Sequence, residues 1–443
     1  MPAFVISPDA AVEALSATPA IEAFRGCQLE HYDKKTIPTF TVDEEIVAYA
    51  SPDSTYAVTK RLLDAASKSI LIGIYDFTAA HMKTIVLNAL ARGVKVTLML
   101  DVETAGGEEK LFNELIALGV DGVRAPACTS ERAHFFASCH EKFIVVDGVW
   151  TLVQSGNYSN NSIPLNEKDG GDPAAFVTGN RDTGLAVKSK SLAKFFTEVL
   201  RSDIALELNA PPGAVEPVLP ETLELALVEA APKRMPSKLF PSKTFALTAP
   251  LKIQPVLSPD NYMSTIPNAL KAAKTSILIE QQYIRASQPD TAVLLAAIKA
   301  ALAANPNLDV RIVLGKVFGA ADLKKEEENL RVLKTKFGLK LRSNVRYINT
   351  DRLVHCHNKM IIIDGSRILI SSQNWSDSAV SKNREAGLLL SHKGLAKYFT
   401  GIFEIDWSTA FTKLPKPEAP QIALATLRRG GFIQAVPADY REV

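Results

Sequence analysis

The sequence predicts an α/β protein made of two related halves, each a mixed β-sheet flanked by helices. One observation is a pair of similar hairpin segments, at residues 140–157 and 357–374. A second is that β-branched apolar runs alternate with helical patterns in both halves, which is typical of sheets covered by helices. A third is that the order of these runs repeats along the chain, which indicates an internal duplication.

The first half is expected at residues 51–205, where helices and strands alternate. It begins at Ser51-Pro52-Asp53, because proline early in a helix, beside Ser and Asp as caps, is a helix-start signal. A first helix then runs to Ala66. The elements expected after it are a strand at 69–77, a helix at 82–91, a strand at 94–101, a helix at 108–118, a strand at 120–125, the first hairpin, a strand at 184–187 and a helix at 192–205.

The second half is expected at residues 251–415 and repeats this order. Its start signal, Ser258-Pro259-Asp260, and its strand from Ser276 lie at one offset of 207 residues from their counterparts (258 minus 51; 276 minus 69). The histidines of the two hairpins are offset by 217 residues (357 minus 140). The difference predicts an insertion before the second hairpin, which we assign to an additional helix at 323–337.

Three further segments flank or join the halves. Residues 1–50 are expected to be an N-terminal extension that packs on the first lobe, with a helix at 10–24. Residues 206–250 form a proline-rich linker, whose proline density excludes a continuous helix and favours an extended crossing. A short helix at 221–230 remains compatible with it. Residues 416–443 are a C-terminal tail, expected to pack back on a lobe.

The two hairpins carry the same polar residues at the same spacing. In the second, His357 and Lys359 precede an apolar run and the turn pair Asp364-Gly365. Side chains alternate along a strand, so the histidine and the lysine point to one face. The shared positions are His140, Lys142, Asp147, Ser155 and Asn157 in the first hairpin and His357, Lys359, Asp364, Ser372 and Asn374 in the second. A neutral imidazole beside a fixed cation, with Ser and Asn returning nearby, suits an anionic phosphoryl group.

An Asn-Arg-acid sequence follows each hairpin, at 180–182 and 383–385. We expect the acids, Asp182 and Glu385, to orient the histidines, because a carboxylate bonded to Nδ1 fixes the tautomer and stabilises the imidazolium. Within each half the expected pairs are Asp182 with His140 and Glu385 with His357. The arginines have two interpretations, as phosphate contacts or as ion pairs between the lobes.

At these residues the chain resembles the phospholipase D superfamily, whose members carry paired HxK(x)4D(x)6GSxN motifs. Both copies match at His, Lys, Asp, Ser and Asn, whereas the glycine of GS is replaced by Gln154 and by Ser371. The resemblance covers roughly residues 50–415. It implies two phospholipase D-like lobes related by a pseudo-twofold axis, with His140 and His357 facing each other across one cleft.

The resemblance also implies covalent cleavage of a phosphodiester without a metal or other cofactor. His140 would attack phosphorus as a neutral imidazole, and His357, protonated, would supply a proton to the leaving oxygen. Asp147 and Asp364 are assigned to the structure of the hairpin turns. The groups expected around the phosphoryl oxygens are Lys142, Lys359, Asn157 and Asn374, with Ser155 and Ser372 as additional hydroxyl donors.

Composition restricts the substrate only in part. The 443 residues are 47% hydrophobic, enough for two domains with accessory segments, and the net charge is +2. So small a charge produces no overall field that would attract nucleic acid or an anionic membrane. We therefore expect a monomeric phosphodiesterase acting on phospholipid headgroups, with transfer to an alcohol as an option. A nuclease of the same superfamily and a non-catalytic phosphodiester-binding scaffold are the alternatives.

Four cysteines in a chain of this size do not predict a disulfide framework. Cys139 and Cys356 precede the two histidines directly, so alternation turns them towards packing as buried thiols. The sequence His355-Cys356-His357 lacks the spaced ligand sets of a zinc site. Neither a membrane-spanning run nor an N-terminal signal peptide is evident, which favours a cytoplasmic protein or export by another route.

Overall fold

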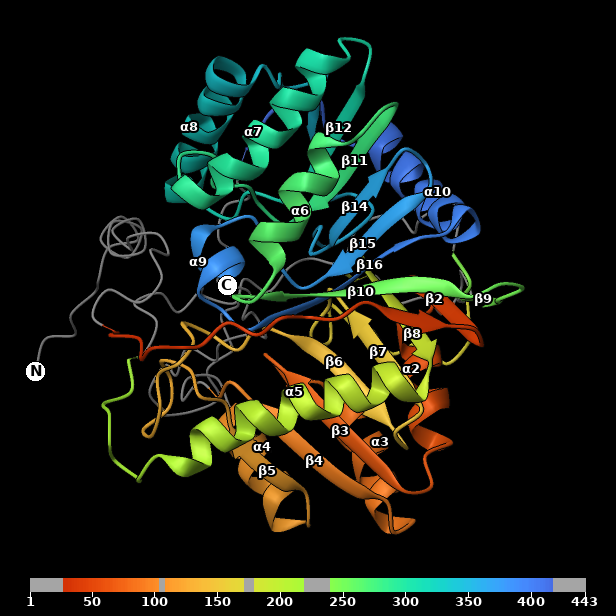
Figure 1. Cartoon of the computed structure of the whole chain (residues 1–443), viewed down its shortest axis with the longest axis vertical. Coiled ribbons are helices and arrows are strands. Elements are labelled where there is room, and N and C mark those ends of the chain that lie inside the picture. Colours follow the sequence, from red (N-terminus) through yellow and green to blue (C-terminus); the bar gives the residue numbers. More distant parts are fainter. Residues whose placement is uncertain (1–26, 103–107, 171–178, 219–239, 417–443) are drawn as a thin grey trace, which may run out of the picture.

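The computed structural model describes residues 27–102, 108–170, 179–218 and 240–416. The helices expected at 10–24 and 221–230 lie outside these ranges, as does nearly all of the C-terminal tail. Within the described residues the first half occupies the lower part of Figure 1 and the second half the upper part. Each contains a mixed sheet flanked by helices, so the predicted fold class is confirmed.

The sheet of the first lobe has the strand order β5-β4-β3-β6-β7-β8-β2-β9. Strands β3, β4 and β5 pair in parallel, and the other pairings are antiparallel. The bounds are β2 Glu45–Ser51, β3 Ser69–Ile74, β4 Lys95–Leu100, β5 Asp121–Arg124, β6 Lys142–Val146, β7 Trp150–Gln154, β8 Asp182–Lys188 and β9 Lys243–Ala246. Strand β6, the lysine-bearing strand of the first hairpin, is buried along its whole length, as its continuous apolar run predicts.

The second sheet repeats the first strand for strand, in the order β13-β12-β11-β14-β15-β16-β10-β1. Its parallel strands are β11, β12 and β13, the counterparts of β3, β4 and β5. The bounds are β1 Phe40–Val42, β10 Leu251–Ser258, β11 Ser276–Gln281, β12 Asp309–Leu314, β13 Val345–Tyr347, β14 Lys359–Ile363, β15 Arg367–Ser371 and β16 Glu385–Ser391. The internal duplication inferred from motif spacing is thus a duplication of topology.

Helices cover the outer faces of both sheets, and two long helices join a core that the lobes share. The first lobe carries α2 Thr55–Asp64, α3 Ala80–Ala91, α4 Glu108–Ala117 and α5 Lys190–Asn209. The second carries α6 Tyr262–Lys271, α7 Pro289–Ala304, α8 Ala320–Phe337, α9 Asp377–Ser381 and α10 Lys393–Thr409. The predicted additional helix of the second lobe corresponds to α8, although its counterpart position in the first lobe also holds a shorter helix, α4.

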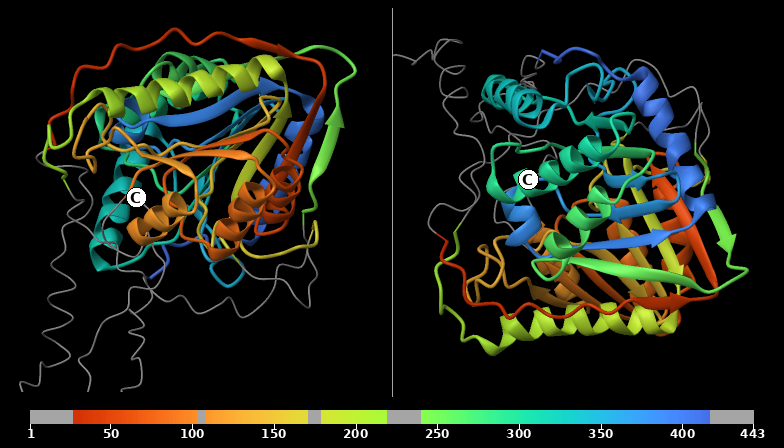
Figure 2. Two further views of the ribbon diagram at one scale, coloured as in Figure 1. Left: turned by 90° about the horizontal axis from the view of Figure 1, so that it is seen from below. Right: turned by 45° about the horizontal axis from the view of Figure 1, so that its top comes forward.

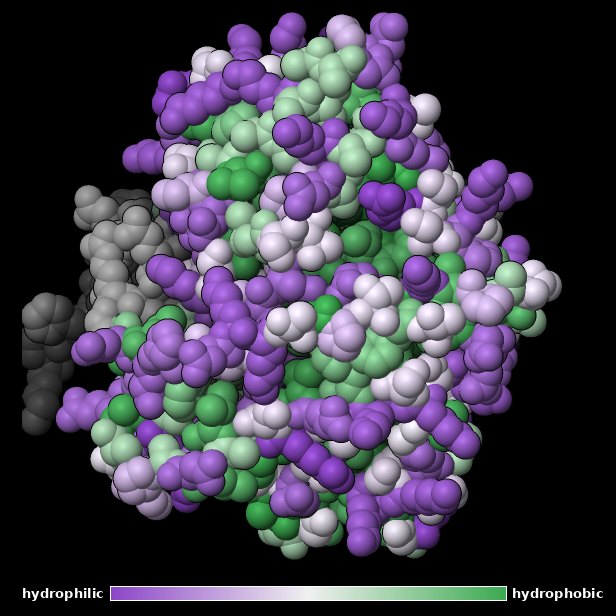
Figure 3. Space-filling model, in the orientation of Figure 1, coloured by the Kyte–Doolittle hydropathy of each residue, from purple (hydrophilic) through white to green (hydrophobic). Residues whose placement is uncertain are grey.

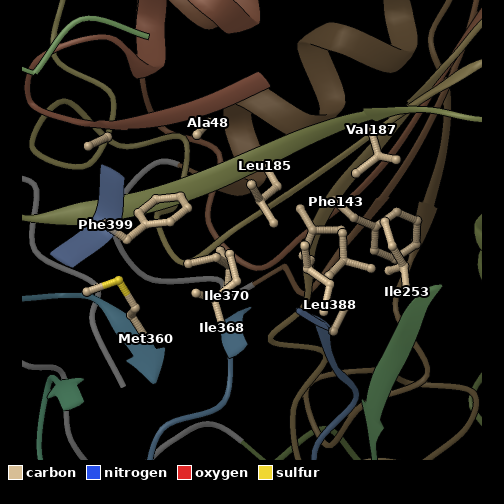
Figure 4. Packing of buried hydrophobic residues seen from close by; sticks show 14 of the residues in the cluster. Ala48, Phe143, Leu185, Val187, Ile253, Met360, Ile368, Ile370, Leu388 and Phe399 are labelled. Atoms are coloured by element: carbon tan, nitrogen blue, oxygen red, sulfur yellow. The ribbon is translucent and has the colours of Figure 1, made fainter. Parts of the chain in front are cut away.

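The shared core lies between the two sheets (Figure 4). Leu185 and Val187 of β8 belong to the same buried cluster as Ile368 and Ile370 of β15. Helices α5 and α10 contribute to this cluster from opposite lobes, for example through Phe196 and Phe399. Burial of apolar surface contributes roughly 25 cal/mol per Å² to the free energy of folding. This shared hydrophobic core therefore joins the halves in addition to the polar contacts between them.

The two lobes exchange edge strands. Strand β1 directly precedes the first lobe's β2, yet it pairs with β10 of the second lobe. Strand β9 directly precedes β10, yet it pairs with β2 of the first lobe. The expectation that residues 1–50 pack on the first lobe as an extension was therefore incomplete, because β1 completes the opposite sheet and β2, which begins at Glu45, is itself a strand of the first lobe. Figure 2 shows this N-terminal segment (red) running along α5 (yellow-green), where Phe40 contacts Phe195 with 5.2 Å between ring centroids.

A disulfide between Cys27 and Cys128 fastens the N-terminal segment to the loop before the first hairpin. The sequence predicted no disulfide framework, and this single pair was missed because its 101-residue separation hides the proximity of the two cysteines. Cys139 and Cys356 are free and buried, as predicted.

Two buried arginines join the lobes through ion pairs. Arg181 of the first lobe binds Asp406 of the second (Nε–Oδ2 2.6 Å) and Asp53 of its own lobe (Nη1–Oδ2 3.0 Å). Arg384 of the second lobe makes the equivalent contacts. It binds Asp203 of the first lobe at 2.7 Å and Asp260 of its own lobe at 2.6 Å. Of the two interpretations of these arginines, the structure supports the ion pairs between lobes.

Replacing Arg181 by Met should lower the free energy of unfolding by about 3–5 kcal/mol, since two carboxylates would remain buried without a cation. Urea unfolding followed by circular dichroism measures this change. Arg331→Met is the control, because Arg331 is 63% exposed beside Glu328 and its ion pair contributes little. A transition for Arg181→Met that coincides with the control would contradict the prediction.

Candidate functional site

Each histidine of the repeated motif lies two residues before the start of a central strand, β6 or β14, and is held in place by the opposite lobe. The amide of His140 donates to the carbonyl of Arg384 at 2.8 Å, and the amide of His357 donates to the carbonyl of Arg181 at 3.0 Å. In return, each arginine amide donates to the carbonyl two residues before the histidine, at 2.8 Å. These crossed ladders bring both hairpins to the lobe boundary, where His140 is 2% and His357 0% exposed.

The acids pair with the histidines across the lobes. Nδ1 of His140 lies 2.9 Å and 3.0 Å from the two carboxylate oxygens of Glu385. Nδ1 of His357 lies 3.0 Å from Oδ1 of Asp182. The expected pairing within each half was therefore wrong. The arginine before each acid forms a β-bridge with the cysteine before the histidine of the opposite lobe. The acid that follows the arginine therefore lies beside that histidine.

The motif serines position these acids. Ser155 donates to Asp182 Oδ1 at 2.8 Å and accepts from the amide of Thr183. Ser372 donates to Glu385 Oε2 at 2.5 Å and accepts from the amide of Ala386. Both hydroxyl hydrogens are thus directed at carboxylates. This arrangement favours a supporting role over the direct phosphate contact that we expected from the sequence.

The motif lysines are fully buried beside the histidines. Lys142 Nζ donates to the carbonyl of His140 at 2.8 Å, and Lys359 Nζ donates to that of His357 at 2.7 Å. Burial lowers the pKa of Lys142 to about 7; Glu385 opposes this shift, and the nearby Lys359 adds to it. Two ammonium groups that disfavour each other in a dry site would be stabilised by an anion placed between them.

Burial lowers the pKa of His140 well below its usual value, and Lys142, Lys359 and His357 lower it further. The pKa of His357 is also lowered, by burial and by the two lysines. Both imidazoles are therefore neutral in this state. The carboxylate at Nδ1 places the ring hydrogen there, which leaves a lone pair on Nε2. Within the described residues, Nε2 of His140 has no hydrogen-bond partner.

Burial also affects the acid beside His140. It raises the pKa of Glu385 to about 8, and Lys142, Ser372 and Asn383 oppose this rise. The hydroxyl of Ser372 and the amide of Asn383 both donate to this carboxyl group, at 2.5 and 3.2 Å. With a third hydrogen directed at it from His140, the geometry is that of an ionised carboxylate. We therefore assign the shared proton to Nδ1 of His140.

The motif asparagines lie where the second strand of each hairpin ends. Asn157 and Asn374 are 0% and 2% exposed. Neither amide atom of Asn157 has a hydrogen-bond partner within the described part of the chain. A buried amide without partners costs free energy, so this side chain is suited to bind an incoming oxygen.

The motif aspartates lie away from these groups, at the hairpin turns. Asp147 has φ 54° and Asp364 φ 53°. The carboxylate of Asp147 accepts from the amides of residues 67–69 at 2.8–2.9 Å. Asp364 binds residues 274–276 in the same way. These contacts tie each hairpin to the start of its neighbouring strand, as the assignment to turn structure implies.

Several residues around this site were not predicted from the sequence. The ring of Tyr75 lies 4.9 Å from that of His140 and 5.2 Å from Lys142 Nζ. Glu141 is buried, and burial raises its pKa to about 8. In the second lobe the equivalent residue, Asn358, donates to Glu280 at 2.7 Å. No repeat marks these residues, because the two copies differ at each of them. A repeat does mark Asp53 and Asp260, but we interpreted it as a helix start.

The described residues contain no group of three or more His, Cys, Asp or Glu side chains placed to hold a metal ion. They also contain no helix both long and apolar enough to cross a membrane. The face drawn in Figure 3 mixes hydrophilic and hydrophobic side chains.

Comparison with known proteins agrees with the duplicated fold. A family model described as "Cardiolipin synthase, PLD-like domain" matches residues 59–204 and 266–407. The crystal structure of phosphatidylserine synthase from Haemophilus influenzae Rd KW20 matches 84% of this chain and 88% of its own, with TM-score 0.58 and 16% identity. Nuc, a phospholipase D family member from Salmonella typhimurium, matches 36% of this chain and 94% of its own, with TM-score 0.29 and 22% identity. No curated protein sequence matches the chain.

The crossed pairing predicts which histidine each acid controls. Glu385→Gln should change the Nδ1 resonance of His140, and Asp182→Asn that of His357, with a loss of kcat of up to about 10⁴-fold. Two-bond ¹H–¹⁵N spectra of histidine-labelled protein measure this, and His→Gln variants assign the signals. Asp147→Asn is the control, since its contacts are at the turn. A change at His357 alone in Glu385→Gln would rule out the crossed arrangement.

Proposed function

The chain belongs to the phospholipase D superfamily, and from that premise we propose that it cleaves phosphodiesters of phospholipids through a phosphohistidine intermediate. One observation carries the proposal. Two imidazoles, each hydrogen-bonded through Nδ1 to a carboxylate of the opposite lobe, lie in one buried site with two lysines. This set supplies a nucleophile, a proton donor and fixed positive charge, which are the requirements of phosphoryl transfer.

In the first step Nε2 of His140 attacks phosphorus, and a P–N bond forms. The bond from phosphorus to the leaving oxygen breaks, and the electron pair stays on that oxygen. His357, protonated when the substrate is bound, gives its Nε2 proton to the same oxygen, so an alcohol leaves. Because both histidines keep a carboxylate at Nδ1, each can carry positive charge during this step.

In the second step water or an alcohol attacks the phosphohistidine. Nε2 of His357, now neutral, takes the proton of the attacking oxygen. The P–N bond breaks, and its electron pair returns to Nε2 of His140. Attack by water gives hydrolysis, whereas attack by an alcohol gives transfer of the phosphatidyl group. Both outcomes use the same residues, so the site is suited to either.

The lysines and Asn157 would stabilise the phosphoryl oxygens in both steps. Charge stabilisation is strong in a site from which water is excluded, because the effective dielectric constant is low. An anion between the lysines also opposes the burial and the Lys359 repulsion that lower the pKa of Lys142. Since Lys142 and Lys359 supply the positive charge, we propose that turnover needs no metal ion and no other cofactor.

Phospholipids are the substrate class that we favour. The matched family model is described as "Cardiolipin synthase, PLD-like domain", and one solved structure that shares the fold along most of the chain is a phosphatidylserine synthase. The net charge of +2 does not provide the extended positive field that polyanionic nucleic acid requires. Both half-sites come from one chain, so we propose that the monomer is sufficient for activity.

A substrate panel with EDTA present tests the reaction class. We expect turnover of at least one phospholipid, with release of the headgroup alcohol, and a phosphatidyl-alcohol product when a primary alcohol is added. Lipid products followed by mass spectrometry measure both. His140→Ala with His357→Ala is the inactive control. Cleavage of DNA or RNA in place of lipid would favour a nuclease, and loss of activity on chelation with recovery by a divalent ion would contradict the proposed mechanism.

The roles of the two histidines can be distinguished by comparing substrates with different leaving groups. His357→Ala should retain cleavage of a p-nitrophenyl ester, because nitrophenolate departs without a proton, and should trap the phosphoryl group on His140. His140→Ala should lose cleavage of both ester types and trap nothing. Release of nitrophenolate and intact-protein mass measure these outcomes. The opposite pattern would exchange the two roles.

A further inference from the structure

A closed ring of hydrogen bonds surrounds the second half-site and crosses the lobe boundary. Nδ1 of His357 lies 3.0 Å from Oδ1 of Asp182, and the same oxygen accepts from the hydroxyl of Ser155 at 2.8 Å. The hydroxyl of Ser155 accepts in turn from the amide of Thr183 at 3.0 Å. The buried hydroxyl of Thr183 donates to Oδ1 of Asn358 at 2.6 Å. Asn358 directly follows His357 in the chain, so the ring closes on the histidine where it began.

The side chain of Asn358 is held in one orientation by three neighbours. Besides Thr183, Oδ1 accepts from the backbone amide of Lys359 at 3.0 Å, and Nδ2 donates to Oε2 of Glu280 at 2.7 Å. Because a backbone amide can only donate, the atom of Asn358 that faces it must be the oxygen. This fully buried side chain therefore ties the backbone beside His357 to Thr183 of the first lobe and to Glu280 of the second.

The equivalent ring of the first half-site is open. Ala386 corresponds to Thr183 at the offset of the motif acids (386 minus 183; 385 minus 182), and its amide donates to Ser372 at 2.9 Å. Alanine has no hydroxyl group to continue the ring. Glu141 corresponds to Asn358 at the offset of the motif histidines (358 minus 141; 357 minus 140). Within the described part of the chain, the buried carboxyl group of Glu141 has no hydrogen-bond partner in another residue.

The two histidines of the proposed reaction have different positional requirements. The nucleophile must move from about 3–3.5 Å from phosphorus to bonding distance. The proton donor stays at hydrogen-bond distance from the leaving oxygen, because only the hydrogen crosses. A closed ring that restrains the imidazole therefore suits the donor, and an open ring suits the nucleophile. Asp182 also has one methylene group fewer than Glu385, so its carboxylate has fewer rotamers.

We propose that Thr183 and Asn358 are positioning residues that fix His357 as the proton donor of the site, through the hydrogen bond that they make across the lobe boundary. Thr183 acts on the imidazole through Ser155 and Asp182, and Asn358 acts through the adjoining backbone. This inference rests on the proposed function and gives its two histidines a geometric reason for different roles.

Leaving-group dependence tests the proposal. The phospholipid that is turned over in the panel is compared with phosphatidyl-p-nitrophenol, using wild type, Thr183→Val, which removes the hydroxyl, and Thr183→Ser, which retains it. Thr183→Val should lower kcat on the phospholipid at least about 10-fold, with little change in KM, because a displaced donor loses general acid catalysis. Its kcat on the nitrophenyl ester should stay within about threefold of wild type. Thr183→Ser should restore most of the activity on the phospholipid.

Thr151→Val is the matched control. Thr151 is also fully buried, but its hydroxyl has no hydrogen-bond partner within the described residues. The same exchange at this position should therefore leave kcat on both substrates close to that of wild type. Equal loss on the two substrates in Thr183→Val, or no loss on the phospholipid, would overturn the inference.

A readout that does not depend on turnover separates this inference from the proposed function. In two-bond ¹H–¹⁵N spectra of histidine-labelled protein, Thr183→Val should shift or broaden the ring signals of His357 and leave those of His140 unchanged. Thr151→Val should alter neither set. Ring signals of His357 that match wild type in Thr183→Val would overturn the inference, even where lipid is cleaved. If wild type cleaves neither substrate while the His357 signals respond, the proposed function fails and the positioning of His357 by this hydrogen bond is still supported.

Discussion

The crossed backbone hydrogen bonds at the lobe boundary are the contacts on which the rest of the molecule depends. The carbonyls of Arg384 and Arg181 hold the amides of His140 and His357, so each hairpin is completed by the other lobe. The guanidinium groups of the same arginines are buried among carboxylates from both lobes. Rotation of one lobe against the other would break the ladders and leave buried charges unpaired, which is strongly unfavourable. One geometric arrangement therefore fixes both the fold and the site.

The dryness of the site explains why so much of it is devoted to charge balance. Each imidazole has a carboxylate, each carboxylate has a serine, and each lysine donates to a backbone carbonyl. These contacts satisfy the groups that are needed in the resting state. Asn157 and Nε2 of His140 have no partner within the described residues, so they are the atoms for which a substrate can compensate. Binding energy is then concentrated at the reacting phosphorus.

Much of the fold and of the set of site residues could be predicted from the sequence, because a strand hairpin is a local structure with a period of two. The spacing of His357, Lys359 and Asp364 specifies which side chains share a face and which one turns. The pairing of Asp182 with His357 could not be predicted, because spacing within one half contains no information about contacts between halves. The disulfide from Cys27 and the ion pairs of Asp53 and Asp260 were missed for a different reason, because each joins residues 101 to 128 positions apart and local spacing contains no information about such contacts. The exchanged strands were missed because β1 and β9 are short and contain no motif.

The exchange of edge strands has a consequence for any attempt to divide the protein. A first half cut at the linker would keep β2 but lose β9, and a second half would keep β10 but lose β1. Each fragment would expose an unpaired sheet edge beside the apolar face of the shared core, which is a template for aggregation. Each edge is complementary to the strand that the other fragment carries. Separately produced halves should therefore be soluble only as a pair, and the minimal folding unit is the whole duplicated chain.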